Sequence, residues 1–235
     1  KENPSVEHAS TLLKRIEAEK QQLITEKKIR KENPPSTIKK EETLFNLPEK
    51  WIWSRGGEIL NFEQGIQVDK NSQTTEKQNG SVRFLRIVDF TQQNAEVRYI
   101  KNPGHKYYIS EDNLVMVRYG TVGHIGSNKS GVLANNLFKI HYHFLQKEYC
   151  IYYFKSPLFL QALKENTIGS IMPSISFKFM KANLIPIPPL EEQKAIVEVV
   201  NQLFREVEQL EELTKERISL KEDFVTSALR KLTET

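Results

Sequence analysis

The last quarter of the chain is one uninterrupted stretch of helix-favouring sequence, and it limits what the rest of the chain can be. From Leu190 to Leu232 the stretch contains neither Gly nor Pro. It follows Pro188 and Pro189, residues that suit the first turn of a helix, and its first two carboxylates lie where the helix dipole is positive. The sequence therefore predicts a helix of roughly 40 residues, or about 60 Å.

Apolar residues recur along this stretch at alternating intervals of three and four, which predicts a single apolar stripe. A small domain cannot bury a stripe of that length, so the pattern indicates a coiled-coil seam. The register slips between Lys215 and Ser219, which favours a shared or bent seam over a perfect dimer seam. The expected seam residues are Ile196, Val200, Leu203, Val207, Leu210, Leu213, Leu220 and Phe224.

A second, shorter amphipathic helix is predicted at the other end of the chain. It opens at Asn3-Pro4-Ser5 and ends before a polar linker, residues 31–35, that two prolines stiffen. If the residues between the helices form one compact domain with its ends close together, the two helices can pack antiparallel. The predicted division is therefore residues 1–43 (helix and linker), 44–188 (globular domain) and 189–235 (long helix).

The middle segment favours short strands. Apolar runs at 82–90, 107–109, 114–118 and 132–140 predict strands, and Ser156 followed by Pro157 predicts a capped helix over 156–164. Trp51 and Trp53 lie two apart, which suits core packing better than base stacking. The expected fold class is α+β: a mixed, strand-rich globular domain flanked by an N-terminal helix and a long C-terminal coiled-coil helix.

Charge is distributed unevenly. The formal net charge is +4, but residues 44–187 carry seventeen Lys and Arg against eleven Asp and Glu, whereas residues 188–235 carry seven against eleven. A basic domain suggests an anionic partner, with nucleic acid the first candidate, and an acidic helix with an apolar seam suggests a protein partner. The excess is modest, and many proteins that never bind DNA have as much, so charge alone does not decide.

The cysteine content, the apolar runs and the first residue indicate where the protein resides and how the chain was obtained. Its lone cysteine, Cys150, excludes an internal disulfide and fits a reducing compartment, so we expect a cytoplasmic protein. No apolar run approaches the ~18 residues that a membrane span needs. The chain begins with Lys1 instead of Met and carries no secretory signal, so we expect an excised or trimmed fragment.

A glycine-rich loop is the most unusual local feature. Four of the ten glycines fall within residues 119–131, ahead of an apolar strand. The run lacks the ending of a P-loop and the spacing of a dinucleotide fingerprint. Two interpretations stay open: a hairpin that carries polar side chains to a groove, and a merely flexible hairpin.

Catalytic motifs are hard to find. His141 and His143 share one strand face, but no third ligand follows at a recognisable spacing, so no zinc site is predicted. The nucleophile elbow and the carboxylate-lysine pattern of nucleases are also missing. Two interpretations of Arg86 and Asp89 are equally favoured: the two side chains form an ion pair with each other, or they contact a ligand. The sequence predicts a non-catalytic binding module without a cofactor.

Four stretches of the chain together resemble the second half of a specificity subunit of type I restriction–modification enzymes. Residues 6–16 resemble the end of the family's central conserved helix, and Leu47-Pro48-Glu49-Lys50-Trp51-Ile52-Trp53 resembles the opening of its target recognition domain. Residues 114–123 resemble a strand followed by a Gly-Thr-x-Gly turn, and residues 169–196 the exit into the distal conserved helix. Residues 54–58 depart from the usual apolar run.

The resemblance implies a mechanism. A full subunit of this family carries two recognition domains held apart by antiparallel conserved helices, and each domain reads one half of a split double-stranded DNA target. The helices dock modification (methyltransferase) subunits, and a restriction subunit joins the larger complex. The chain itself is then non-catalytic.

Side-chain chemistry selects the candidate DNA contacts from the predicted loops and strand ends. Candidates for phosphate are Lys70, Lys77, Arg98, Lys101, His105 and Lys106, and candidates for base edges or the groove are Tyr119, His124, Asn128, Lys129 and Lys178. Two alternatives remain: a coiled-coil scaffold that binds no DNA, and a single-domain specificity protein that forms a homodimer through its long helix and reads a symmetric target.

Overall fold

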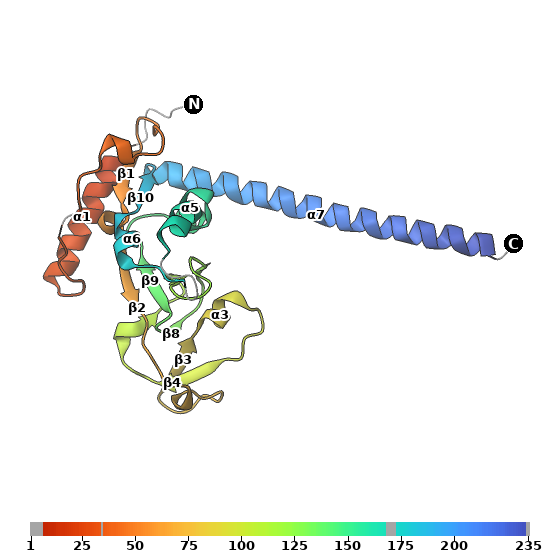
Figure 1. Ribbon diagram of the computed structural model, residues 1–235, viewed down its shortest axis with the longest axis horizontal. Coiled ribbons are helices and arrows are strands. Elements are labelled where there is room, and N and C mark those ends of the chain that lie inside the picture. The colour runs from red at the N-terminus through yellow and green to blue at the C-terminus, as the bar shows by residue number, and fades with distance from the viewer. Residues whose placement is uncertain (1–6, 34, 168–172, 234–235) are drawn as a thin grey trace. The chain divides into compact units, whose positions relative to one another are not determined.

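The computed structural model describes residues 7–33, 35–167 and 173–233. The chain forms two compact units, residues 1–193 and 194–235. The first is strand-rich and begins with a helix, and the second continues a single helix, α7 (Leu190–Thr233) (Figure 1). The predicted α+β class, with an N-terminal helix and a long C-terminal helix, is confirmed, whereas antiparallel packing of the two helices stays a prediction. Within the described residues, no helix is both long enough and apolar enough to cross a membrane.

Helix α1 (Ala9–Thr25) belongs to the core of the first unit. The Nδ1 atom of His8 accepts a hydrogen bond from the backbone N–H of Ser10 (3.1 Å) and caps the helix. Ala9, Leu12 and Ile16 are buried in the main core, as the helical spacing of these residues predicts. The predicted opening at residues 3–5 lies outside the described residues.

A two-stranded antiparallel sheet joins the beginning and the end of the globular domain. β1 (Ile52–Arg55) pairs with β10 (Leu184–Ile187), and Ile52 lies opposite Ile187. Trp51 donates a hydrogen bond to Glu192 (Nε1 to Oε2, 2.6 Å), and the ring of Trp53 packs edge-on against Phe45 at 5.0 Å between centroids. Trp51 therefore makes an intramolecular hydrogen bond and Trp53 a ring contact, but both side chains are half-buried and lie outside the buried core, so the prediction of core packing was wrong in part.

Two four-stranded sheets form the rest of the domain. One has the order β2 (Asn61–Gln64), β9 (Leu137–His141), β6 (Leu114–Val117), β7 (Ile125–Gly126) and is antiparallel throughout. The other has the order β4 (Arg98–Lys101), β3 (Ser81–Leu85), β8 (Gly131–Leu133), β5 (Tyr108–Ile109), with β3 and β8 parallel. In Figure 1 the second sheet lies at the end of the first unit farther from α1.

Two strand predictions were wrong in part. Residues 132–140 form two strands in different sheets, because a turn at Asn135 and Asn136 separates β8 from β9. Residues 82–90 form β3 and then the short helix α3 (Ile87–Thr91), because the Asp89 carboxylate accepts the backbone N–H of Arg86 (2.9 Å) and so starts a helical turn.

The core lies between the first sheet and the helices α2 (Gly56–Ile59), α4 (Lys147–Lys155), α5 (Pro157–Asn166) and α6 (Phe177–Ala182). Short 3-10 turns complete the domain at Lys40–Glu42, Lys70–Ser72 and His105–Tyr107. Phe138, Phe154 and Phe159 are essentially inaccessible, and each contributes about 1.5–3 kcal/mol by burial. Ser156 caps α5 by accepting the N–H of Phe159 (3.3 Å), as predicted.

The first turn of α7 is fixed to the domain. Gln193 is fully buried; its Oε1 accepts the backbone N–H of Gln146 (2.9 Å) and its Nε2 donates to the carbonyl of Pro188 (2.9 Å). These bonds satisfy the side-chain amide of Gln193 and the backbone N–H of Gln146, the residue that precedes α4, as buried polar groups require. The long helix therefore starts from a fixed point on the domain.

Candidate nucleic-acid interface

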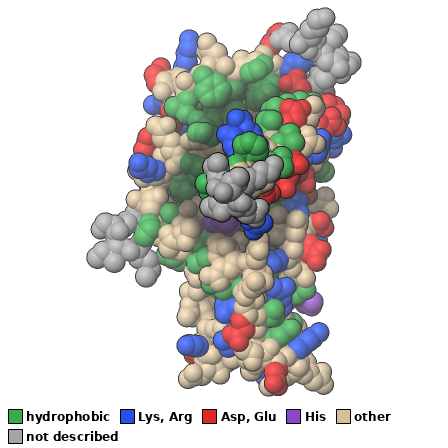
Figure 2. Space-filling view, turned by 90° about the vertical axis from the view of Figure 1, so that its right-hand side faces the viewer, with side chains coloured by type: hydrophobic (Ala, Val, Ile, Leu, Met, Phe, Trp, Pro, Cys, Tyr) green, Lys and Arg blue, Asp and Glu red, His purple; other side chains and the backbone are tan. Residues whose placement is uncertain are grey.

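Most of the predicted phosphate contacts gather around the second sheet. Lys101 lies on β4 opposite Ser81, and the backbones of Thr74 and Tyr99 bond to each other, so the loop that carries Lys70 and Lys77 lies along the same edge. The exposed residues of this set are Lys70, Lys77, Lys101, His105 and Lys106. In the lower part of Figure 2, Lys and Arg side chains lie scattered among acidic and other side chains, so this face carries no continuous basic patch.

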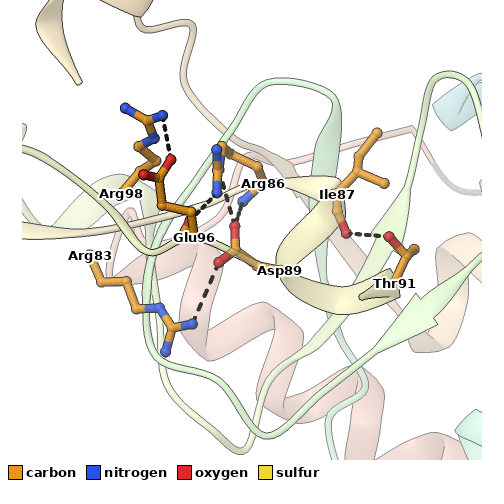
Figure 3. Close-up of polar contacts among 7 residues, drawn as sticks. All are labelled: Arg83, Arg86, Ile87, Asp89, Thr91, Glu96 and Arg98. Carbon is orange, nitrogen blue, oxygen red and sulfur yellow. Dashed lines mark hydrogen bonds and ion pairs between the residues drawn. The ribbon is translucent and has the colours of Figure 1, made fainter. Parts of the chain in front are cut away.

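An arginine cluster lies on β3, α3 and β4 of this sheet, around the buried carboxylate of Asp89 (Figure 3). Asp89 accepts from Nε of Arg86 (3.2 Å) and lies 3.5 Å from Nη2 of Arg83, and its side chain has no exposed surface. The pairing of Arg86 with Asp89, one of the two interpretations open at sequence level, is thus present.

The outer side of the cluster faces water. The side chain of Arg83 is 36% exposed and that of Arg86 24%. Arg98 pairs with Glu96 (2.5 Å), whose carbonyl also accepts from Arg86. Within the described part of the chain, Nε of Arg83 is buried without a hydrogen-bond partner. Three guanidinium groups are therefore held in place while part of the Arg83 and Arg86 side chains stays exposed to solvent, and fixed guanidinium groups of this kind suit phosphate or guanine recognition.

Arg83 was not among the predicted contacts. It lies on β3 three residues before Arg86, and no local pattern separated it from other strand residues. The signal in the sequence was the acidic residue Asp89 within an apolar run, since a buried carboxylate requires cationic partners.

The glycine-rich loop connects the two sheets and is packed along part of its length. A side chain at Gly126 would meet the ring of Phe90 at 2.3 Å, and one at Gly123 would meet Leu163 at 2.3 Å. His124 Nε2 lies 3.2 Å from the carbonyl of Phe90 at α3. The loop is therefore fitted against α3 and α5, which disfavours the interpretation of a merely flexible hairpin.

The predicted groove contacts within and beside this loop fall into different environments. Asn128, which has a left-handed backbone (φ 60°), accepts from Lys147 (Nζ to Oδ1, 3.0 Å). Tyr119 lies under the guanidinium of Arg118 (5.1 Å to the ring centroid), and Lys129 is half-buried. Lys178 lies on α6, where it lines a hollow with α1 and linker residues 29–33, 35 and 36.

The structure brings a carboxylate to the two histidines that the sequence left without a third ligand. His143 Nδ1 lies 2.7 Å from Oε2 of Glu19 on α1, and its Nε2 lies 2.7 Å from Oδ1 of Asn61. The rings of His141 and His143 are perpendicular, with centroids 4.4 Å apart. Burial lowers the pKa of both histidines, so both rings are neutral near pH 7.

The apolar seam of α7 is exposed along most of its length. The side chains at the predicted positions beyond Val200 have large accessible fractions: Leu203 54%, Val207 49%, Leu210 63%, Leu213 60%, Leu220 62% and Phe224 75%. Ile196 and Val200 are half-buried. An exposed apolar stripe of this length is typical of a helix that binds another chain.

Comparison with known proteins points to one family. Residues 48–220 match the family described as "Type I restriction modification DNA specificity domain". The chain is 28% identical to the type I restriction enzyme EcoAI specificity subunit of Escherichia coli, over 91% of this chain and 38% of that protein. It is 25% identical to the EcoEI specificity subunit, also of Escherichia coli, over 89% and 38%. The chain thus spans less than two fifths of the length of these relatives.

Two solved structures share the fold. The crystal structure of the HsdS subunit from Thermoanaerobacter tengcongensis superposes with a TM-score of 0.59 at 21% identity, covering 72% of this chain and 41% of that one. A structure described as "Structural basis underlying complex assembly and conformational transition of the type I R-M system" gives a TM-score of 0.60 at 19% identity, over 85% and 49%. At these identities the likeness concerns the fold.

Proposed function

Because the chain belongs to the family of type I restriction modification DNA specificity domains, we propose that it reads one half of a split, double-stranded DNA target. The observation that carries the proposal is the arginine cluster around Asp89, which holds oriented and partly exposed donors on the second sheet. Guanidinium groups bind phosphate and the guanine edge through paired N–H donors. A fixed guanidinium also loses little conformational freedom on binding.

The roles divide by position. Lys70, Lys77 and Lys101, which are exposed along the edge of the second sheet, would bind phosphates and set the register of the domain on the duplex. Arg83 and Arg86 would enter a groove. The remaining predicted contacts, at Arg98, His105, Lys106, Lys178 and the glycine-rich loop, stay predictions as well.

The long helix would bind protein. Its exposed seam and its net negative charge suit modification (methyltransferase) subunits, with a restriction subunit joining the larger complex. A second copy of the chain, joined through the same seam, is the alternative occupant. The chain would act without chemistry of its own, in the cytoplasm, where its single thiol stays reduced.

The test is selection from a randomised duplex DNA pool at several salt concentrations, with the chain alone and then with a methyltransferase partner. We expect a short half-site to be enriched, or a symmetric repeat at fixed spacing if the chain forms a dimer. Affinity should fall as salt rises, because phosphate contacts release counterions. Binding that ignores salt and enriches no sequence would favour a scaffold that binds only proteins.

Matched variants locate the interface. Arg83→Ala should cost about 1–3 kcal/mol of binding free energy and relax one target position. Lys101→Ala should weaken all sequences alike. Arg30→Ala is the control, because this exposed arginine lies beside α1. Equal effects of Arg83→Ala and Arg30→Ala would show that the cluster does not read DNA.

A further inference from the structure

The residues Glu19, His141 and His143 come from two elements that are far apart in the sequence. His141 ends β9, and His143 adopts a left-handed backbone (φ 46°) that turns its ring back toward His141. Glu19 reaches the pair from α1, across 124 residues of sequence. One donor atom from each residue lies within 4.8 Å of the others, and His143 has no exposed side-chain surface. These donors form a compact, largely enclosed set.

The contacts of His143 leave one ring nitrogen facing a carboxylate oxygen, a position that a cation can occupy. A neutral imidazole has one N–H and one lone pair, yet both ring nitrogens of His143 face oxygen atoms that can accept, Asn61 Oδ1 and Glu19 Oε2, each at 2.7 Å. If Nε2–H donates to Asn61, the lone pair of Nδ1 points at a carboxylate oxygen. A positive charge between these two atoms, from a proton or a metal ion, resolves the contact.

We propose that Glu19, His141 and His143 form a site for a divalent ion of the zinc class. Two imidazoles and one carboxylate, with a fourth position left open, are a donor set that zinc accepts in proteins. Asn61 then has the role of an outer-shell acceptor, which fixes the tautomer and orientation of the His143 ring. Tetrahedral zinc places its ligand atoms about 3.3 Å apart, so Glu19 and His143 need to separate by about 0.6 Å. The His141 donor atom, which lies within 4.8 Å of the others, needs to approach by about 1.5 Å at most.

The surroundings of the site are compatible with a dication. Lys20 and Lys139 act electrostatically on the histidine pair, but each has another partner. Lys20 donates to the carbonyl of Gly57 (2.6 Å), and Lys139 pairs with Glu63 (2.8 Å). The strand register places Asn61 directly opposite His141, so the outer-shell residue belongs to the same sheet as the ligands.

The bound ion would fix α1 to the β2–β9 edge of the first sheet. The contact between Glu19 and His143 already joins these elements, and metal ligation would replace a single contact with three bonds to one centre. The site stands on its own geometry, so it holds or fails independently of DNA recognition.

The test measures zinc binding to the full chain, stripped with a chelator and desalted, by competition with a chromophoric zinc indicator. We expect one zinc per chain. His143→Asn and Glu19→Gln should each weaken binding by about tenfold or more, since each removes a ligand. Asn suits position 143, because it tolerates the left-handed backbone. Glu17→Gln, an exposed neighbour on the same helix with the same charge change, should leave binding unchanged.

Two further measurements make the outcome decisive. Cobalt(II) added to the stripped wild-type chain should give the intense visible absorption of a low-coordinate site, and His143→Asn should abolish it. Circular dichroism confirms that each variant is folded, and His141→Gln replaces any variant that is not. Zinc binding that persists unchanged in His143→Asn, or a wild-type chain that binds none, would overturn the proposal.

Discussion

Removing the carboxylate of Asp89 should destabilise the first unit more than any other single acidic substitution that we consider. The carboxylate accepts the backbone N–H of Arg86 at 2.9 Å and Nε of the same residue at 3.2 Å, and it lies 3.5 Å from Nη2 of Arg83. Asp89→Ala deletes the start of α3 and leaves two guanidinium groups without their buried partner.

The size of the expected loss of stability depends on how far the partners of Asp89 are exposed to solvent. Breaking a fully buried ion pair costs about 3–5 kcal/mol, because the remaining charge is left without compensation. Here Arg83 and Arg86 keep 36% and 24% of their side-chain surface exposed, so water can solvate part of each charge. The loss of the helix-starting hydrogen bond adds about 1 kcal/mol. We therefore expect Asp89→Ala to lower the free energy of unfolding by about 2–4 kcal/mol.

Urea unfolding followed by tryptophan fluorescence is the appropriate assay. Trp51 and Trp53 are the only tryptophans of the chain, and both lie in the first unit, so unfolding of α7 does not dominate the signal. Asp69→Ala is the matched control, because Asp69 is exposed and its side chain caps nothing at the turn that follows. A loss no larger than that of Asp69→Ala would refute the structural role assigned to Asp89.

The same position also separates two explanations of DNA binding. Asp89→Asn preserves shape and raises the net charge by one, so simple attraction predicts tighter binding at every salt concentration. If Asp89 instead orients Arg83 and Arg86, the variant should lose sequence preference despite the added charge. Fluorescence anisotropy with the selected half-site and a scrambled duplex measures both. Tighter binding with preference intact would contradict the orienting role.

Three further perturbations test packing, thiol chemistry and the seam. Gly56→Ala should destabilise the fold by about 1–3 kcal/mol or more, because the new Cβ would lie 2.1 Å from the carbonyl oxygen of Met180. Gly57→Ala, where the nearest atom would lie at 3.2 Å, should change stability little. Chemical denaturation measures the free energy of unfolding of both variants. Burial raises the pKa of the Cys150 thiol, so alkylation by iodoacetamide near pH 9 should stay slow until urea unfolds the chain, as mass spectrometry can follow. Leu210→Lys should weaken association through α7 in sedimentation experiments and leave the DNA affinity of the chain alone unchanged; unaltered association would exclude the seam from the interface.

Features set by neighbouring residues could be predicted from the sequence. The long helix follows from a Gly- and Pro-free stretch with a proline start, and α5 follows from Ser156 and Pro157, because capping and helical periodicity act over a few residues. The α+β class and the family resemblance rest on similarly local patterns. Length and apolar spacing also predicted an exposed seam, since no domain of this size could cover it.

The arrangement of the sites depended on the tertiary structure. The apolar run at residues 82–90 does not show that Asp89 starts a helix within it. The run at residues 132–140 does not show that a turn of two asparagines separates β8 and β9, which belong to different sheets. Glu19 meets His143 across 124 residues, and Lys178 lies on α6 beside a hollow lined by α1. Contacts of this kind depend on how the whole intervening chain folds. That folding is set by which sheets and helices can bury their apolar surfaces against one another. Periodicity, in contrast, determines only which face of an element is buried, and therefore specifies elements without specifying which of them meet.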